Sequence, residues 1–247
     1  MTTRETALDA SCSRLRSLNP DYPRMFAVAT MADEGKRRWW SLAKDLRGDR
    51  VSRMFARSLE DVPIADVAVT QVATSLIHAV VGRVVALVVL EGRAWDPGVE
   101  NLWIHMDSDE NIDWAGVVDE TLRVLPDDPF TGHPRTVTVP CEQALLLWTV
   151  HRCLTSLRAV FDAVAACGPL DEDRFWALVG ESVLGTATFL PILAGEGEAV
   201  AQRRGQGLLD AFVATGVPVR SRGRTPHPHC TRPLRPTNSG RYQESPT

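Results

Sequence analysis

A long apolar segment at residues 66–90 constrains the fold of this chain more than any other stretch of its sequence. Its sequence, DVAVTQVATSLIHAVVGRVVALVVL, is longer than an ordinary strand and suits a helix, although its many valines are typical of strands. Polar side chains interrupt it, among them His78 and Arg83, and an arginine in the middle of a bilayer is costly. We therefore expect no membrane span. Instead we expect a helix buried at the centre of a globular domain, capped by Asp66 and ended by Gly92.

The patterns on either side of this segment predict an α+β fold that is predominantly α-helical, with a small β element. We expect one α-rich globular domain over residues 1–219. It comprises an N-terminal helical part, a central helix with short strands, and a helical-bundle part, at residues 1–60, 61–139 and 140–219. The remaining residues, 220–247, contain six arginines, five prolines and one acidic residue, which predicts a disordered tail.

Local signals place the shorter elements of the first two parts. Residues 101–106 alternate apolar and polar side chains, as a half-buried strand does, and residues 135–139 favour another short strand. Between them, residues 108–120 are acidic, and residues 122–134, with three prolines and a glycine, are typical of a loop. Trp39 and Trp40 are expected on a helix, with side chains about 100° apart, either as packing anchors or as a stacking platform beside basic residues.

The helical-bundle part is expected to form three helices, at residues 141–167, 171–195 and 198–215. In the second of them, Gly180 and Gly185 lower the helix surface, which would allow another segment to approach closely.

Charge and motif content exclude several functions. Residues 1–219 carry 21 basic and 30 acidic side chains, and an acidic body with a short basic tail does not predict a nucleic-acid-binding surface. No phosphate loop, nucleophile elbow or dinucleotide-binding glycine pattern is present in the sequence. Five widely spaced cysteines, with no secretory leader before them, favour free thiols in a reducing cytoplasm.

Three histidines are candidate ligands of a metal ion or a haem iron: His78, His105 and His151. His78 lies among valines, where an imidazole must be hydrogen-bonded or ligated. His105 shares the polar face of its expected strand with Trp103, and His151 lies off the apolar stripe of its helix. For each of them a structural or surface histidine is the alternative. The tail sequence His227-Pro228-His229-Cys230 also holds ligand types, but a proline-rich tail makes a poor closed site.

The candidate substrate-binding residues are Arg83, Asn101, Trp103 and Trp114. An arginine within an apolar helix must be paired or must reach the surface of the domain. Asn101 and Trp103 lie on the polar and aromatic face of the expected strand. His78 precedes Arg83 by five residues, which is roughly 140° around an α-helix, so these two side chains need not face one site. No catalytic residue is assigned.

Four segments together resemble the FhuF-like ferric-siderophore reductases, over roughly residues 50–219. They are VATSLIHAVVGRVVALVVLEGRAWD, ENLWIHM, GESVLGTATFLPILAG and GLLDAFVATG. The third is similar to a small-residue helix of that family, with Gly180, Ser182 and Leu184 near the matching positions. The resemblance implies an α-rich cytoplasmic protein with a small β element that meets an iron chelate.

The sequence departs from that family after Gly216. The family holds an iron–sulfur cluster through a Cys-Cys pair and a later Cys-x-x-Cys, whereas this chain has Cys230 alone in that region. We therefore expect no four-cysteine cluster. Three function classes stay open: an iron-chelate-binding or redox protein without its own cluster, a biosynthetic redox enzyme that uses haem or iron on a histidine ligand, and a non-catalytic accessory protein. The small-molecule partner would be an iron chelate or a biosynthetic intermediate.

Overall fold

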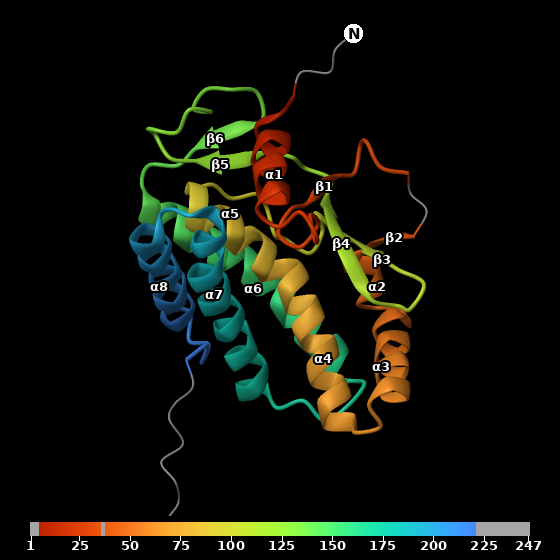
Figure 1. The fold of residues 1–247 in the computed structure, drawn as a ribbon. Coiled ribbons are helices and arrows are strands. Elements are labelled where there is room, and N and C mark those ends of the chain that lie inside the picture. The colour runs from red at the N-terminus through yellow and green to blue at the C-terminus, as the bar shows by residue number, and fades with distance from the viewer. Residues whose placement is uncertain (1–4, 36–37, 221–247) are drawn as a thin grey trace, which may run out of the picture.

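The computed structural model of this chain describes residues 5–35 and 38–220. It confirms the predominantly α-helical α+β fold with a small β element (Figure 1). The predicted disordered tail, apart from Arg220, and its His227–Cys230 sequence lie outside the described residues.

The expected central helix is present and runs without a break from Ala65 to Glu91. It consists of α4 (Ala65–Ile77), a π-helical turn η1 (His78–Gly82) and α5 (Arg83–Glu91). Gly92 ends it in the left-handed conformation, with φ of 66°, as expected. The predicted cap is wrong: Ile64 occupies the N-cap position, and Asp66 lies in the first turn, where its charge still suits the helix dipole.

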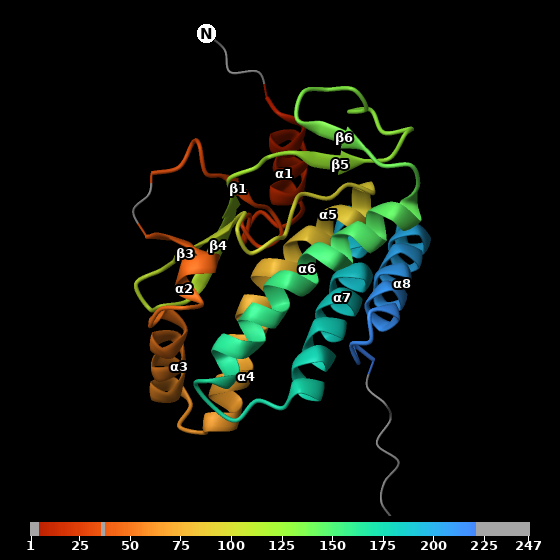
Figure 2. The ribbon, with the colours of Figure 1, turned by 180° about the vertical axis from the view of Figure 1, so that it is seen from behind.

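Three long helices of the C-terminal part pack around this central helix (Figure 2). They are α6 (Glu142–Ala165), α7 (Glu172–Ala194) and α8 (Glu198–Ala214), and they confirm the three helices expected there. Gly180 allows close approach, since a Cβ at that position would lie 1.9 Å from the carbonyl oxygen of Val219. Gly185 does not, because no atom lies within 4 Å of the corresponding point. The expectation for Gly185 was therefore wrong.

A four-stranded sheet with the strand order β1-β4-β3-β2 lies against the π-helical turn in the middle of the central helix. Its strands are β1 (Ala29–Thr30), β2 (Trp39–Ser41), β3 (Leu102–Met106) and β4 (Ile112–Val117). β1 pairs parallel with β4, and the other pairs are antiparallel. The expected strand at 101–106 is confirmed as β3. Strand β4 lies in the acidic stretch 108–120, for which no strand was predicted. Its first half is half-buried and its second half is fully buried, so buried and exposed residues do not alternate along it.

A two-stranded parallel sheet joins β5 (Leu122–Val124) to β6 (Thr136–Thr138). β6 confirms the short strand expected at 135–139. β5 falls in the stretch 122–134 that was expected to be a loop, and this expectation was wrong for these three residues.

The N-terminal part contains α1 (Ala7–Leu18), α2 (Leu42–Asp45) and α3 (Arg50–Asp61). The two tryptophans expected on a helix lie on strand β2 instead, where successive side chains point to opposite faces. Trp39 is buried, whereas Trp40 is half-buried beneath the guanidinium of Arg50, 3.3 Å from its ring centre. The helix prediction failed because the strand is only three residues long and gives no period to recognise.

One hydrophobic cluster extends through the described chain, from Ala7 to Val219. Within the part of the chain that the structure describes, two helices are long and apolar enough to cross a membrane by length and composition alone, namely 65–91 and α7. The most apolar window of the first is 83% buried inside the protein, and that of α7 is 44% buried. The first is therefore the core helix of the domain, while α7 keeps an exposed apolar face.

Candidate functional site

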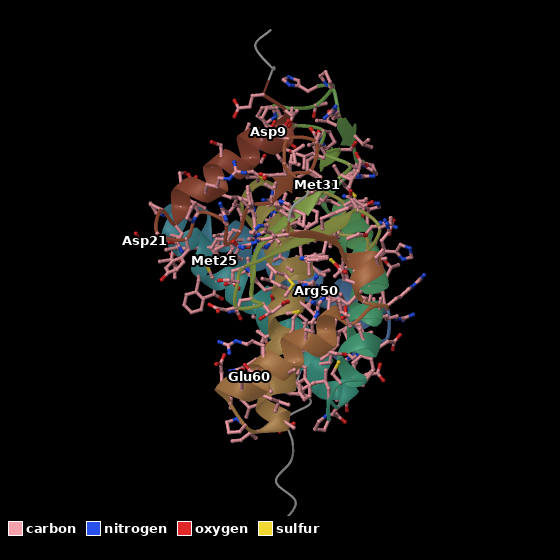
Figure 3. All side chains as sticks on the ribbon, turned by 90° about the vertical axis from the view of Figure 1, so that its right-hand side faces the viewer. Asp9, Asp21, Met25, Met31, Arg50 and Glu60 are labelled. Carbon is pink, nitrogen blue, oxygen red and sulfur yellow. The ribbon has the colours of Figure 1, made fainter. Side chains whose placement is uncertain are left out.

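A pocket of about 630 Å³ lies where loop 19–28 meets the central helix and strand β4. Three segments supply its lining: Asp21, Tyr22, Pro23, Arg24 and Met25 from the loop, His78 and Arg83 from the helix, and Ile112 and Asp113 from β4. Asp21 and Met25 lie close together at one edge of the molecule in Figure 3. This volume is in the range of pockets that bind small molecules.

The π-helical turn explains why His78 and Arg83 face the same pocket. The backbone N–H of Arg83 donates to the carbonyl oxygen of His78, which precedes it by five residues rather than four. Residue i+5 therefore lies above residue i along the helix axis. The expectation that the two side chains need not share a site assumed a regular α-helix, and the π-turn removes that separation. Such turns are rare in proteins, and many of those that occur lie at functional sites.

His78 is held as a neutral imidazole. Its Nε2–H donates to the carbonyl oxygen of Met25 at 2.8 Å, since a carbonyl can only accept. Burial, reinforced by the nearby charge of Arg83, lowers the pKa of His78 from 6.5 to about 4, although the Met25 bond acts in the opposite direction. Nδ1 faces Gly82, where a Cβ would lie only 2.2 Å away. Neither ring nitrogen is therefore placed to ligate a metal.

Arg83 is a buried cation, with 2% of its surface exposed. Its guanidinium donates to the carbonyl oxygens of Arg24 and of Ala27, the latter at 2.8 Å, and lies 3.5 Å from the carbonyl oxygen of Asp113. Its Nε has no hydrogen-bond partner among the described residues. Burial lowers the pKa of Arg83 to about 10, and the charge of Asp113 opposes this shift. Arg83 thus fastens the loop to the core and brings a positive charge to the pocket.

A β-bulge in strand β4 brings Asp113 into contact with His105. His105 is opposite Trp114, and Met106 is opposite Ile112, so Asp113 is the extra residue. Its Oδ1 lies 2.6 Å from Nδ1 of His105, and its Oδ2 accepts from Arg24 at 3.1 Å. Because Asp113 also lines the pocket, the histidine expected on the β3 face is linked to the pocket through this carboxylate. His105 itself is not part of the lining.

Aromatic rings lie beside this carboxylate. Trp39 packs against His105 and Trp114, with ring centres 5.2 and 5.5 Å away. The guanidinium of Arg24 lies 4.6 Å from the centre of the Trp114 ring, which is a cation–π contact. The predicted substrate-binding residue Trp114 therefore supports Arg24, a lining residue, and its own Nε1 is buried with no partner in the described part of the chain.

The structure places the other predicted site residues away from this pocket. Asn101 is buried, and its side-chain amide bonds to the backbone of Asp96, Val118 and Asp119, which is a structural role for it. Trp103 is half-buried on β3, opposite Gly116. His151 is exposed on α6 and lines none of the described pockets. His78, His105 and His151 are therefore not gathered into one site.

The thiols are also separate. Cys12 and Cys153 are buried, Cys141 is exposed, and Cys167 is half-buried. Burial raises the pKa of Cys12 to about 11 and raises that of Cys153 further. Within residues 5–35 and 38–220, no group of three or more histidine, cysteine, aspartate or glutamate residues could hold a metal ion. The described residues thus do not fit an iron–sulfur cluster.

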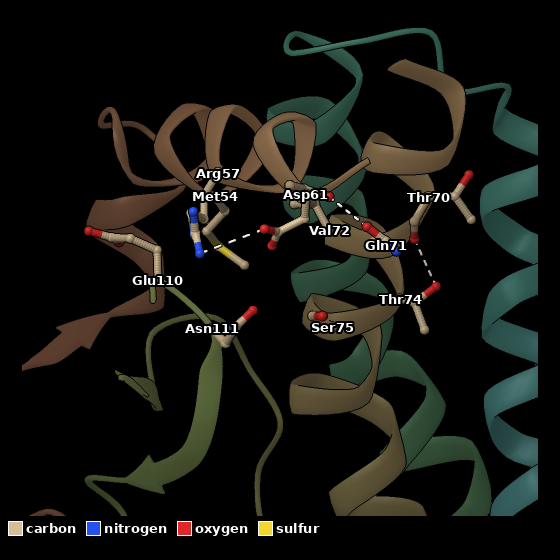
Figure 4. A pocket seen from close by; sticks show the side chains of 11 residues that line it. Met54, Arg57, Asp61, Thr70, Gln71, Val72, Thr74, Ser75, Glu110 and Asn111 are labelled. Atoms are coloured by element: carbon tan, nitrogen blue, oxygen red, sulfur yellow. Dashed lines mark hydrogen bonds and ion pairs between the residues drawn. The ribbon is translucent and has the colours of Figure 1, made fainter. Parts of the chain in front are cut away.

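A second pocket, of about 450 Å³, lies between α3, α4 and the turn before β4 (Figure 4). Its polar groups mostly satisfy one another. Ser58 donates to Gln71 at 2.7 Å, Thr74 donates to the carbonyl oxygen of Thr70 at 2.8 Å, and Arg57 pairs with Asp61 at 3.7 Å. None of the predicted site residues lines it. We therefore regard the pocket at His78 and Arg83 as the candidate site.

Comparisons with protein-family models, with curated proteins and with solved structures find no match to this chain. The candidate site therefore stands on its own geometry. Sequence reasoning found two of its nine lining residues, His78 and Arg83, and missed the other seven: Asp21, Tyr22, Pro23, Arg24, Met25, Ile112 and Asp113. The first five lie in or directly after a break with two prolines, which predicts a loop but not where the loop packs. The position of Asp113 depends on a β-bulge, which the alternation of apolar and polar residues does not reveal.

Proposed function

We propose that this protein binds a ferric chelate with oxygen donors in the pocket at His78 and Arg83, without an iron–sulfur cluster of its own. The observation that carries the proposal is the buried guanidinium of Arg83, which lines the pocket and bonds to carbonyl oxygens rather than to a carboxylate. A cation without a direct ion pair in a partly enclosed site favours negatively charged oxygen atoms as its ligand. Hydroxamate and carboxylate oxygens of a ferric chelate are of this kind.

The remaining lining suits such a ligand. The side chain of Arg24 is half exposed and can turn toward a ligand. Tyr22, with 70% of its surface exposed, can pack over the apolar part of that ligand. His78 is neutral above about pH 4 and adds no second charge. The resemblance to ferric-siderophore reductases supports the same ligand class. Free thiols support a reducing, cytoplasmic setting.

Calorimetric titration with N-acetyl ferrioxamine B, a neutral ferric trihydroxamate, tests the proposal. We expect binding by the wild type, weaker binding of the metal-free ligand, and an affinity loss of at least about tenfold in Arg24→Gln, because a charged hydrogen bond contributes about 1.5–3 kcal/mol. Arg57→Gln, in the second pocket, is the matched control and should bind like the wild type. Absence of binding, or equal affinities in both variants and the wild type, would overturn the proposal.

A second candidate function, a haem or iron centre on a histidine, is favoured by one observation at His105. Asp113 accepts a hydrogen bond from Nδ1, which fixes the tautomer and leaves the lone pair on Nε2. His78 is also held by a hydrogen bond from one ring nitrogen, but its Nδ1 faces Gly82, so His105 is the better placed of the two to ligate a metal. Haemin titration checks this function. A Soret shift that disappears in His105→Ala and persists in His151→Ala would support it, and identical spectra of the two variants would exclude it.

A further inference from the structure

An apolar groove of about 500 Å³ continues from the candidate site along helix α7. It shares Met25 and His78 with the pocket, so these two residues form a common wall. The α7 residues that line the groove lie at positions i, i+3, i+4, i+7, i+8, i+11 and i+15 and therefore occupy one face of the helix: Leu178, Glu181, Ser182, Gly185, Thr186, Phe189 and Leu193.

Several large apolar side chains of the groove are exposed to solvent. Phe189 is 66% exposed, Leu193 is 49% exposed and Met25 is 42% exposed. Among the described lining residues only Glu181 carries a charge, because His78 is neutral at physiological pH. Gly185 lines the groove without a side chain, and a Cβ at this position would meet no atom within 4 Å. An exposed apolar surface of this kind favours an apolar ligand.

We propose that this groove binds an apolar arm of the same ligand whose oxygen-rich head occupies the pocket at Arg83. The substrate class is then a chelate that carries an acyl or alkyl chain. This inference rests on the proposed function, and it follows from the wall shared between a pocket with a buried cation and a nearly uncharged groove. The lined face of α7 from Leu178 to Leu193 extends about 22 Å, at about 1.5 Å per residue, which leaves room for an extended acyl chain.

Two ferric ligands that differ only in this arm provide the test: N-acetyl and N-octanoyl ferrioxamine B. Each buried methylene tightens binding by up to about fourfold, so the octanoyl form should bind the wild type at least about tenfold more tightly, even with most of the gain lost to ordering. Gly185→Phe places an aromatic ring in open groove space and should abolish this preference while leaving the acetyl affinity unchanged. Phe189→Ala should reduce the preference by about threefold to tenfold.

Thr188→Phe is the matched control, because Thr188 is exposed on the same helix and lies outside the groove lining. It should keep the full preference. Equal affinities of the two ferric ligands for the wild type overturn the groove proposal and leave the proposed function standing. Failure of both ligands to bind overturns both. If the metal-free octanoyl ligand binds as tightly as its ferric complex, and Gly185→Phe abolishes this binding, the groove takes an acyl chain but the ligand is not a ferric chelate, which overturns both the proposed function and the inferred substrate class.

Discussion

Gly82 and His78 form the most directly testable contact of the π-helical turn. In the middle of a helix, replacing glycine with alanine ordinarily stabilises a protein by about 0.8–1.0 kcal/mol. Here the new Cβ would lie 2.2 Å from Nδ1 and 2.8 Å from Cε1 of His78, so the imidazole must move. Its movement breaks the hydrogen bond to Met25, a loss of about 1 kcal/mol, and adds strain of about 1–3 kcal/mol. Gly82→Ala should therefore destabilise the protein by about 1–3 kcal/mol.

A double-mutant cycle isolates this contact. In a His78→Ala background the ring is absent, and Gly82→Ala should then stabilise the protein by up to about 1 kcal/mol. The coupling free energy between the two positions should be at least about 2 kcal/mol, measured by urea unfolding followed through tryptophan fluorescence. The reasoning is refuted if Gly82→Ala alone is stabilising, or if the two changes are additive within about 0.5 kcal/mol.

Three other predictions follow from the buried ionisable groups. The pKa of His78 is lower in the folded protein than in the unfolded chain, so the unfolded chain binds the proton first as pH falls from 6.5 toward about 4. Over this window the wild type should lose up to about 3 kcal/mol more stability than His78→Gln. The prediction fails if the urea midpoints of the two proteins fall by the same amount between pH 7, 5 and 4. Arg83→Met removes two charged hydrogen bonds of about 1.5–3 kcal/mol each but also the cost of burying the charge, about 3 kcal/mol for a pKa of 10. We expect a net loss of up to about 3 kcal/mol, and a variant more stable than the wild type would disprove it. Iodoacetamide at pH 8 should label the exposed Cys141 in the native protein, as mapped by mass spectrometry. The buried Cys12 and Cys153, whose thiol pKa values are raised, should react only after unfolding, and labelling of either in the native protein would contradict this.

The long helices could be predicted from the sequence because each carries a strong local pattern. The apolar run before Gly92 and the cap at Asp171, whose side chain accepts from the backbone of Arg174 at 3.1 Å, are signals of this kind. Short strands such as β2 and β5 contain too few residues to show a period, and their positions come from tertiary pairing.

The candidate site was predictable only in part. His78 and Arg83 could be recognised because a polar group in an apolar helix requires a partner. Their common orientation could not, since a π-turn differs from an α-turn by one residue and carries no reliable sequence signal. Asp113 and the loop residue Arg24 reach the site through a bulge and through long-range contacts with the central helix, and neither feature has a local pattern.

The manner in which loop 19–28 is fastened has a consequence for how ligand preference can evolve. His78 and Arg83 bond to backbone carbonyl oxygens of Arg24, Met25 and Ala27, not to their side chains. A carbonyl oxygen is present whatever residue occupies the position, so substitutions at Tyr22, Arg24 or Met25 leave these anchors intact. The walls of the pocket can thus diverge between related chains, or be redesigned, while the helix and the course of the loop are retained.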